Sequence, residues 1–254
     1  MSAGSESLAG WVVSLDLWGT LITEGDRAAE AAWRVDEFTR VLEEFGHPRG
    51  RAQIEAAISH ERNTSLQHQR ETGSQPNAAG QIANILAALG LPSPDAGLLA
   101  VLEVVHTHAV LRACPLPVDG AFDALAAIRA AGPSRLVLTS NTLSTPPAVH
   151  RELLADLDLC GHFDDLLFSA DLGIAKPRPE IFRTAAQRAG VPTERIVHVG
   201  DDRLTDVQGA VGAGCRAVYY NPKGHLPPPH VTAVTTLREL PQVLVALCGE
   251  QTPA

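Results

Sequence analysis

The sequence predicts an α/β fold: a doubly wound parallel sheet with an inserted helical domain. Short apolar runs rich in valine, leucine and isoleucine recur along the chain and have the composition of strands buried on both faces. These runs alternate with segments of helical periodicity, which is the pattern of successive βαβ units. Residues 24–113 depart from this alternation, because helical periodicity continues there with almost no strand signal.

The expected strands follow the apolar runs in order. Residues 11–15 form the first strand, which Gly19 ends, and residues 135–139 form the second. Later strands are expected at 165–169, 196–199, 216–220 and 231–234. Helices are expected at 121–131 and 180–189, and Pro179 stands just before the second of these, where proline favours a helix start.

The inserted segment is expected to contain four helices. Their ranges are 28–45, 51 to about 67, 78–89 and 95–112, separated by glycine- and proline-containing stops and a polar loop at 71–76. We therefore assign residues 1–23 and 114–254 to an α/β core and residues 24–113 to a helical cap. The prolines of segment 115–120 suit a hinge between the two.

Composition and charge exclude several functional classes. The net charge is −9 and no block is rich in lysine or arginine, which argues against nucleic-acid binding. The opening residues 1–7 lack both a basic start and a long apolar stretch, so we expect neither a signal peptide nor a membrane role, and we expect a cytoplasmic protein. The four cysteines are widely spaced without a Cys-x-x-Cys pair and are expected to be reduced thiols.

Polar residues stand where the predicted strands end. Asp16 follows the first strand, and a carboxylate there is costly unless it is paired or bound to a metal; the alternative is an aspartate that caps the next turn. Ser140 and Asn141 follow the second strand and suit anion binding by hydrogen bonds. Lys176 lies in a proline-rich loop, where a solvated charge is the alternative role.

A cluster of carboxylates follows the strand at 196–199. Asp201, Asp202 and Asp206 lie on one strand-to-helix turn after Gly200, and so many like charges repel unless a cation neutralises them. His198, inside the strand, is interpreted as a hydrogen-bonded strand histidine rather than a catalytic one.

Four motifs thus follow one another along the chain: Asp16, the Ser140-Asn141 pair, the loop of Lys176 and the acidic turn at 200–206. In this order and context they resemble the motifs of the haloacid dehalogenase-like hydrolase superfamily, in its helical-cap branch. The resemblance covers residues 9–23 and 114–245. It implies a core of the doubly wound type predicted above and a mobile helical lid over the active site, which selects the substrate. Candidate cationic contacts in the lid, each also explained as a solvated side chain, are Arg34, His60, Arg62, His68 and Arg70.

The resemblance also implies roles at the strand ends. Asp16 would be the nucleophile that forms a covalent aspartyl intermediate, and Lys176 would keep it ionised by lowering its pKa. Ser140, the Asn141 amide and Lys176 would neutralise phosphate oxygens. Mg²⁺ would be the cofactor, with the residues of its site being Asp16, the backbone carbonyl of Trp18, Asp201 and, from the second shell, Asp206. Asp202 is expected further out.

Trp18 departs from the pattern of phosphatases in this superfamily. Such enzymes usually carry a second aspartate two positions after the nucleophile, which protonates the leaving oxygen. An indole has no titratable proton in this range, so general acid–base catalysis, worth about 10² to 10⁴ in rate, is missing from its usual place. The backbone carbonyl survives the substitution, so the metal site need not be lost.

Three functions are therefore open. The first is a Mg²⁺-dependent phosphatase of a small phosphorylated metabolite, with a good leaving group or an acid supplied by the cap. The second is a metal-independent, dehalogenase-like hydrolase acting at carbon, because members of that type carry an aromatic residue at the Trp18 position. The third is a non-catalytic protein that binds a phosphorylated ligand. The sequence indicates neither the substrate nor the oligomeric state.

Overall fold

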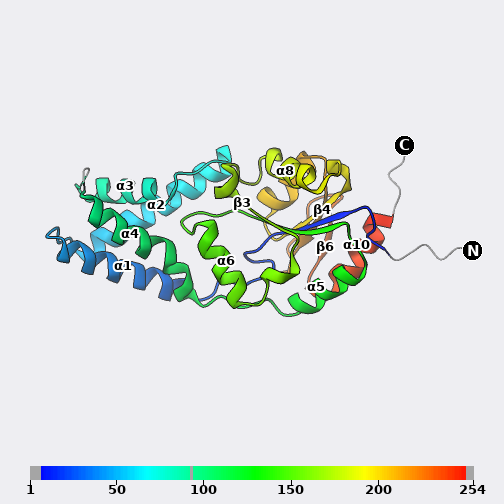
Figure 1. Ribbon diagram of the computed structural model, residues 1–254, viewed down its shortest axis with the longest axis horizontal. Coiled ribbons are helices and arrows are strands. Elements are labelled where there is room, and N and C mark those ends of the chain that lie inside the picture. The colour runs from blue at the N-terminus through cyan, green and yellow to red at the C-terminus, as the bar shows by residue number, and fades with distance from the viewer. Residues whose placement is uncertain (1–6, 92–93, 250–254) are drawn as a thin grey trace, which may run out of the picture. The chain divides into compact units, whose positions relative to one another are not determined.

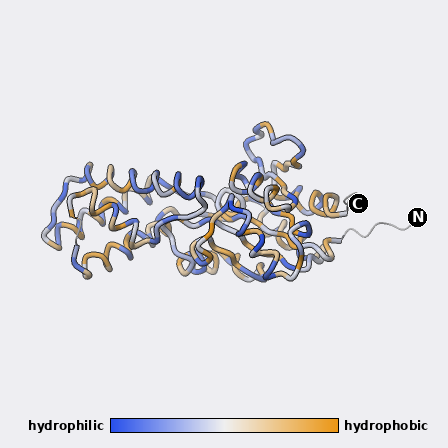
Figure 2. Tube along the Cα trace, turned by 90° about the horizontal axis from the view of Figure 1, so that it is seen from above, coloured by the Kyte–Doolittle hydropathy of each residue, from blue (hydrophilic) through white to orange (hydrophobic). Residues whose placement is uncertain are grey.

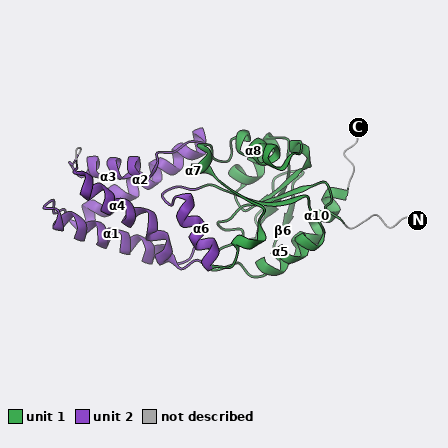
Figure 3. Cartoon of the chain, in the orientation of Figure 1, with its two compact units in different colours: residues 1–23, 116–141, 157–254 green, residues 24–115, 142–156 purple. Residues whose placement is uncertain are grey.

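The computed structural model describes residues 7–91 and 94–249, and it divides the chain into two compact units (Figure 3). The first, called the sheet unit below, contains residues 1–23, 116–141 and 157–254. The second, called the helical unit, contains residues 24–115 and 142–156. Most of the opening segment, residues 1–6, and residues 92–93 between the third and fourth expected helices of the insert lie outside the described residues.

The sheet unit is built on six parallel strands (Figure 1). Their order in the sheet is β3-β2-β1-β4-β5-β6. The strands are β1 (Val12–Leu15), β2 (Arg135–Ser140), β3 (Asp165–Phe168), β4 (Ile196–Gly200), β5 (Arg216–Tyr220) and β6 (Thr232–Val234). The predicted α/β class with a doubly wound parallel sheet is thus confirmed, since the strand order reverses at β1.

The register of the central strand determines where the candidate site lies. Leu15, the last residue of β1, pairs with Leu138 of β2 on one side and with Val199 of β4 on the other. The Asp16 amide continues the ladder by donating to the Val199 carbonyl at 2.9 Å. The carboxyl ends of β2, β1 and β4 therefore lie side by side, where ligands bind in open α/β sheets.

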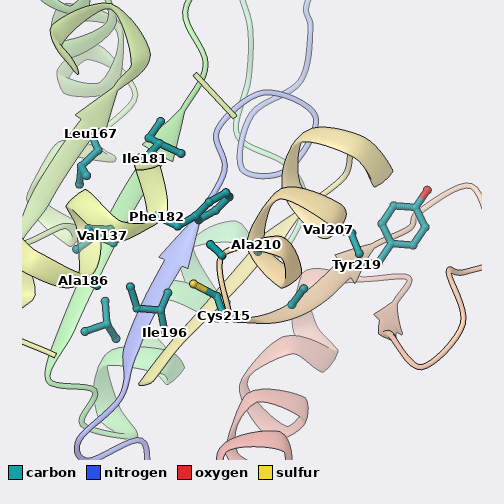
Figure 4. Close-up of a cluster of buried hydrophobic side chains, with 14 residues drawn as sticks. Val137, Leu167, Ile181, Phe182, Ala186, Ile196, Val207, Ala210, Cys215 and Tyr219 are labelled. Carbon is teal, nitrogen blue, oxygen red and sulfur yellow. The ribbon is translucent and has the colours of Figure 1, made fainter. Parts of the chain in front are cut away.

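One face of the sheet packs against a cluster of buried apolar side chains (Figure 4). Val12 and Val137 contribute from β1 and β2, and Ile181 and Phe182 from helix α8 (Pro179–Ala189). Every residue of β1 and β4 is buried, because both faces of these strands are covered, which is typical of parallel sheets.

Further helices complete the sheet unit. They are α5 (Ala121–Ala130), α7 (Ser169–Leu172), α9 (Gly209–Gly212) and α10 (Leu240–Gly249), with short 3₁₀ turns η2 (Cys160–His162), η3 (Thr193–Arg195) and η5 (Leu237–Glu239). The turn η4 (Arg203–Gln208) is a π-helix, a form that often accompanies functional sites.

The helical unit consists of α1 (Arg27–Glu44), α2 (Arg51–Thr72), α3 (Ala78–Ala88), α4 (Ala96–His108), the 3₁₀ turn η1 (Ala109–Ala113) and α6 (Pro147–Asp156). Side-chain caps start three of these helices: Asp26 for α1, Asn77 for α3 and Asp95 for α4. Phe38 lies in the apolar core that α1 to α4 share. Apolar and polar residues alternate along these helices at helical spacing (Figure 2).

The structure differs from the sequence-based assignment in several places. Helix α2 continues to Thr72, beyond the predicted end near residue 67. Helices α6 and α10 are absent from the sequence-based assignment, and the apolar run of α10 has no period that distinguishes it from a buried strand. Residues 142–156, assigned to the core from sequence, belong to the helical unit, where glutamine side chains hold the start of this segment.

Among the described residues, segment Ala96–Ala113 has the length and mean hydropathy (18 residues, 1.3) of a membrane span. The buried core helix of a globular unit meets the same criterion, and 44% of this segment is buried, with its apolar face packed on α1 and α3.

Candidate active site

Three carboxylates from separate parts of the sheet unit meet at the carboxyl ends of its strands. Asp16 follows β1 directly, Asp201 follows β4, and Asp206 lies in the π-helical turn η4. One potential ligand atom of each residue lies within 4.8 Å of the others. Asp16 and Asp206 are buried, and Asp201 is partly exposed. Three of the residues singled out from the sequence are therefore brought together.

Lys176 lies at the centre of this cluster and is 1% exposed. Its Nζ is 2.6 Å from Oδ1 of Asp16 and 2.6 Å from Oδ1 of Asp206, and it donates a third hydrogen bond to the Thr139 carbonyl at 2.8 Å. An ammonium group has three donors, so these contacts use its full capacity. Lys176 is thus a buried, fully paired cation rather than a solvated surface charge.

Asn141 holds the loop that carries Lys176. Its Nδ2 donates to the Lys176 carbonyl and its Oδ1 accepts from the Lys176 amide, both at 2.8 Å. Two hydrogen bonds from one side-chain amide to one residue fix that residue's backbone. Both polar atoms of the Asn141 side chain are used in this contact. The Ser140 hydroxyl donates to the Asn141 carbonyl at 3.3 Å.

A chain of buried hydrogen bonds leads from β2 through β1 to the acidic cluster. Thr139 Oγ1 lies 2.9 Å from Ser14 Oγ, Ser14 Oγ lies 2.8 Å from His198 Nδ1, and His198 Nε2 lies 3.2 Å from Asp206 Oδ1. A carboxylate can only accept, so Nε2 carries the proton and Nδ1 accepts from the Ser14 hydroxyl. Burial lowers the pKa of His198, which favours this neutral form.

This chain agrees with the interpretation of His198 as a hydrogen-bonded strand histidine, and it adds a positioning role toward Asp206. The ring of Phe182 packs edge-on against it, 5.1 Å between centroids. Sequence reasoning missed Ser14 and Thr139, although their position inside apolar runs marks them as buried hydroxyls that need partners.

The carboxylate of Asp206 is held on both oxygens. Oδ1 faces Lys176 and His198, and Oδ2 accepts from the Asp202 amide at 2.9 Å. Asp202 in turn caps the π-helical turn, since its Oδ1 accepts from the amides of Leu204 and Thr205 at 2.8 and 2.9 Å. These donors leave Asp206 less free to bind a cation directly than Asp16 and Asp201.

Two glycines make room for the carboxylates. Gly19 has φ +74°, and a Cβ on it would lie 2.4 Å from Oδ2 of Asp201. A Cβ on Gly200 would lie 2.3 Å from Cγ of Asp206. Real Cβ atoms do not approach other atoms so closely, so both positions keep space that a side chain would fill.

With all three carboxylates ionised, the cluster would carry more negative charge than Lys176 can balance. Burial raises the pKa of Asp16 to about 8 against the opposing effect of Lys176, with Asp206 and Asp201 adding to the rise. Burial and Asp206 likewise raise the pKa of Asp201 to about 7. Burial also acts to raise the pKa of Asp206, but Lys176 and His198 hold it below its ordinary value.

The ionisation of Asp16 corrects one sequence-based expectation. Lys176 does act to lower the pKa of Asp16, as predicted, but burial outweighs it and the net shift is upward. Burial would lower the pKa of Lys176, yet Asp16 and Asp206 together raise it well above its ordinary value, so the ammonium stays charged. One cation for three carboxylates is too few, and a second cation would restore the balance.

The residues fit a bound Mg²⁺. Carboxylate oxygens are the ligands a hard divalent cation prefers, the glycines preserve the space around them, and the raised pKa values of Asp16 and Asp201 indicate that positive charge is lacking.

Trp18 lies two residues after Asp16 in a tight loop. It is half-buried and forms an isolated parallel bridge with Ile22, which also bridges to Pro117, and the Gly19 amide donates to the Ile22 carbonyl at 2.9 Å. The loop therefore holds the Trp18 backbone next to the strand end, while its indole offers no acid.

The five cationic candidates of the predicted lid differ in their surroundings within the helical unit. Arg34 is buried and pairs with Glu30, with 2.6 Å between Nη2 and Oε1. The remaining four are exposed or half-buried side chains of α2: His60, Arg62, His68 and Arg70. For Arg34 the structure thus shows a buried ion pair in place of the expected solvated role.

The chain belongs to the haloacid dehalogenase-like hydrolase family, which matches residues 12–214. Among curated proteins, a phosphoserine phosphatase of Thermus thermophilus is 40% identical over 95 residues, covering 37% of this chain and 36% of that protein. The pyrimidine 5′-nucleotidase YjjG of Escherichia coli is 33% identical over 150 residues, covering 56% and 63%. The chain thus spans between one third and two thirds of the length of these relatives.

Solved structures of two kinds share the fold. A phosphatase of this family from Thermococcus onnurineus has a TM-score of 0.64 at 21% identity, covering 92% of this chain and 97% of that one. A 2-haloacid dehalogenase from Pseudomonas syringae has a TM-score of 0.63 at 23% identity, covering 93% and 99%. These similarities show the fold alone, so the reaction must be argued from the site.

Replacing Gly19 by alanine should weaken Mg²⁺ binding about tenfold or more, because the added Cβ must displace the Asp201 carboxylate. Gly10→Ala is a matched control: Gly10 has φ +79°, so the backbone strain is the same, about 1–2 kcal/mol, but no heavy atom lies within 4 Å of the added Cβ. Titration calorimetry with Mg²⁺ measures the difference. Equal affinities of the two variants would contradict the assignment of Asp201 to the site.

Stabilisation of the protein by Mg²⁺ should increase with pH. The folded-state pKa of Asp16 lies above its ordinary value of 3.8, so the ion-free protein loses stability as pH rises toward about 8. A cation binds the ionised carboxylates and must displace their protons at low pH. We expect Mg²⁺ to raise the unfolding temperature clearly more at pH 9 than at pH 6. Two results would argue against this site. One is an increase in unfolding temperature with Mg²⁺ that does not depend on pH. The other is an equally large increase in the double variant Asp16→Asn/Asp201→Asn.

Proposed function

We propose that this protein is a Mg²⁺-dependent phosphatase that hydrolyses a small phosphorylated metabolite through an aspartyl-phosphate on Asp16. The observation that carries the proposal is the buried acidic cluster with Lys176 at its centre. Three carboxylates around one ammonium group suit a site that accepts a divalent cation and a phosphate together. The phosphatase and nucleotidase relatives support the same chemistry, each over part of the chain.

The residues divide the reaction into two displacements at phosphorus. An Asp16 carboxylate oxygen attacks the phosphorus atom, a P–O bond forms, and the bond to the leaving oxygen breaks with its electron pair. Water then attacks the same phosphorus atom, releases orthophosphate and restores Asp16. Mg²⁺, held by Asp16 and Asp201 with the Trp18 carbonyl, would offset the negative charge of the phosphoryl oxygens when bound.

The remaining residues of the site would orient the phosphoryl group and neutralise its charge. Lys176 offers its charge at Asp16, where a phosphoryl group would arrive, and Asp206 also pairs with the ammonium. Ser140 would donate to a phosphoryl oxygen. The Asn141 side chain already holds Lys176, so its part in phosphate binding falls to its backbone amide.

Trp18 restricts the substrate. With no acid at this position the leaving oxygen must depart as a stable anion or take its proton from elsewhere, so we propose an acyl phosphate or a pyrophosphate linkage as the substrate class.

Hydrolysis at carbon is the second candidate, and Trp18 is the observation that favours it, because an aromatic residue stands where phosphatases of the superfamily have an acid. The acidic cluster weighs against it. Three carboxylates in a site that needs no cation would repel one another without a benefit. A third candidate, ligand binding without turnover, retains the cluster but leaves Asp16 without a chemical task.

The test is hydrolysis of an aryl phosphate by the purified chain with Mg²⁺, with a chelator, and with Asp16→Asn. We expect phosphate release that stops with the chelator and falls at least about 10³-fold in the variant, because the nucleophile is lost. Asp123→Asn, a change at an exposed aspartate in a surface ion pair, should retain full activity.

Trp18→Asp separates the candidates within the same assay. If the missing acid limits the rate, this variant should hydrolyse phosphates with poor leaving groups faster by up to about 10²-fold. Halide release without metal, or saturable phosphate binding without turnover in the wild type, would reject the phosphatase proposal in favour of the second or third candidate.

A further inference from the structure

Three glutamine side chains of the helical unit converge on the backbone that follows β2. Gln69 from the last turn of α2 donates to the Thr142 carbonyl at 2.7 Å. Gln75, in the loop after α2, donates to the Leu143 carbonyl at 2.7 Å, and Gln81 of α3 donates to the same carbonyl at 3.0 Å. All five residues belong to the helical unit. We call the three glutamines the glutamine clamp.

The clamp donates hydrogen bonds to the backbone carbonyls of Thr142 and Leu143, which lie outside any helix or strand. Residues 141–146 are neither helix nor strand, so their carbonyls need partners where they are buried. Gln69 and Gln81 are 3% and 2% exposed, which means that both amides are withdrawn from water to make these contacts. Gln69 also donates to Oε1 of Gln75, which links two members of the clamp.

The orientation of the Gln81 amide is fixed from the opposite side. Its Oε1 lies 3.0 Å from Nε2 of His106 in α4, and its Nε2 is used on the carbonyls of Leu143 and Pro76. Burial lowers the pKa of His106 to about 3, with Arg34 adding to the effect, so the ring is neutral and donates from Nε2. If the Gln81 amide were flipped, its NH₂ group would face the Nε2–H of His106 and its oxygen would face the carbonyls of Leu143 and Pro76.

The clamped segment begins one peptide bond after the phosphate-binding residues. Asn141 is the last residue of the sheet unit at this point and Thr142 is the first of the helical unit. Asn141 fixes the backbone of Lys176 by two hydrogen bonds, and Lys176 contacts Asp16. The carbonyl end of the Thr142 residue is therefore held by the helical unit, while its amide end is bonded to Asn141.

We propose that the glutamine clamp positions Asn141 for phosphate binding, so that Gln69, Gln75 and Gln81 are positioning residues of the site. The inference rests on the proposed function, since it concerns the phosphate-binding end of the same site. The clamp acts on the β2 side alone. The proposed cation ligands Asp16 and Asp201 follow β1 and β4. Loss of the clamp should therefore weaken binding of phosphate much more than binding of Mg²⁺.

The experiment uses the full chain with Gln69→Met, Gln81→Met and both changes together. Methionine keeps the length of the side chain and removes the amide. Gln67→Met is the matched control on α2, since Gln67 is exposed and donates only to Glu71. Binding of inorganic phosphate in the presence of Mg²⁺, binding of Mg²⁺ alone, the KM for an aryl phosphate and hydrogen exchange of residues 140–147 are measured for each protein.

We expect the double variant to bind inorganic phosphate about tenfold more weakly and to show a KM raised to a similar extent. A tenfold change corresponds to about 1.4 kcal/mol, which is within the usual net contribution of a hydrogen bond. Its affinity for Mg²⁺ should stay within about twofold of the wild type. Exchange of residues 140–147 should become faster than in Gln67→Met.

Two results would overturn the proposal. One is phosphate affinity in the double variant equal to that of the control. The other is a parallel loss of phosphate affinity, Mg²⁺ affinity and unfolding temperature, which would mean general destabilisation. A wild-type protein that binds inorganic phosphate but does not hydrolyse aryl phosphates would reject the proposed function alone, while one that binds no inorganic phosphate would reject both.

Discussion

The ammonium group of Lys176 is the constraint on which the candidate site depends. Removing a charge from water costs several kcal/mol, and Lys176 recovers this cost through Asp16, Asp206 and the Thr139 carbonyl. Each of these partners is in turn buried or part of a strand. The ammonium thus sets the positions of the Asp16 carboxylate and of the acidic turn at once, and the raised pKa values of Asp16 and Asp201 support the proposal that the site binds a second cation.

The fold provides this arrangement because of its strand order. With β1 between β2 and β4, the groups that follow three strands meet at one edge, and each comes from a distant part of the chain. Beneath this edge the hydrogen bonds from Thr139 through Ser14 and His198 fix Asp206 from inside the sheet. At the same edge, the lack of a Cβ at Gly19 leaves room for the Asp201 carboxylate. The strands thus position the charged side chains, and the glycines next to the strand ends leave room for them.

The sequence predicted the parts of this account that are local. Asp16 and Lys176 stand in short motifs whose neighbours in the chain identify them, and the six strands follow from apolar runs with clear ends. The Ser14–His198 contact depends on the register of β1 against β4, which no periodicity specifies. The upward shift of the pKa of Asp16 depends on how much water the completed fold excludes. The attachment of residues 142–156 to the helical unit depends on side chains about seventy residues away, such as Gln69.

A double-mutant cycle on Lys176 and Asp206 tests the central claim most directly. Lys176→Met should cost about 3–5 kcal/mol of unfolding free energy in the ion-free protein, because it leaves a buried carboxylate unpaired. In the Lys176→Met background, Asp206→Asn should lower the unfolding free energy much less than it does in the wild type. The difference between the two effects, the coupling energy, should be about 2 kcal/mol or more. The exposed pair of Arg238 and Asp119 is the reference, with an expected coupling below about 1 kcal/mol. Additive effects of the Lys176 and Asp206 changes would contradict the account, since the ammonium would then not hold the acidic cluster together.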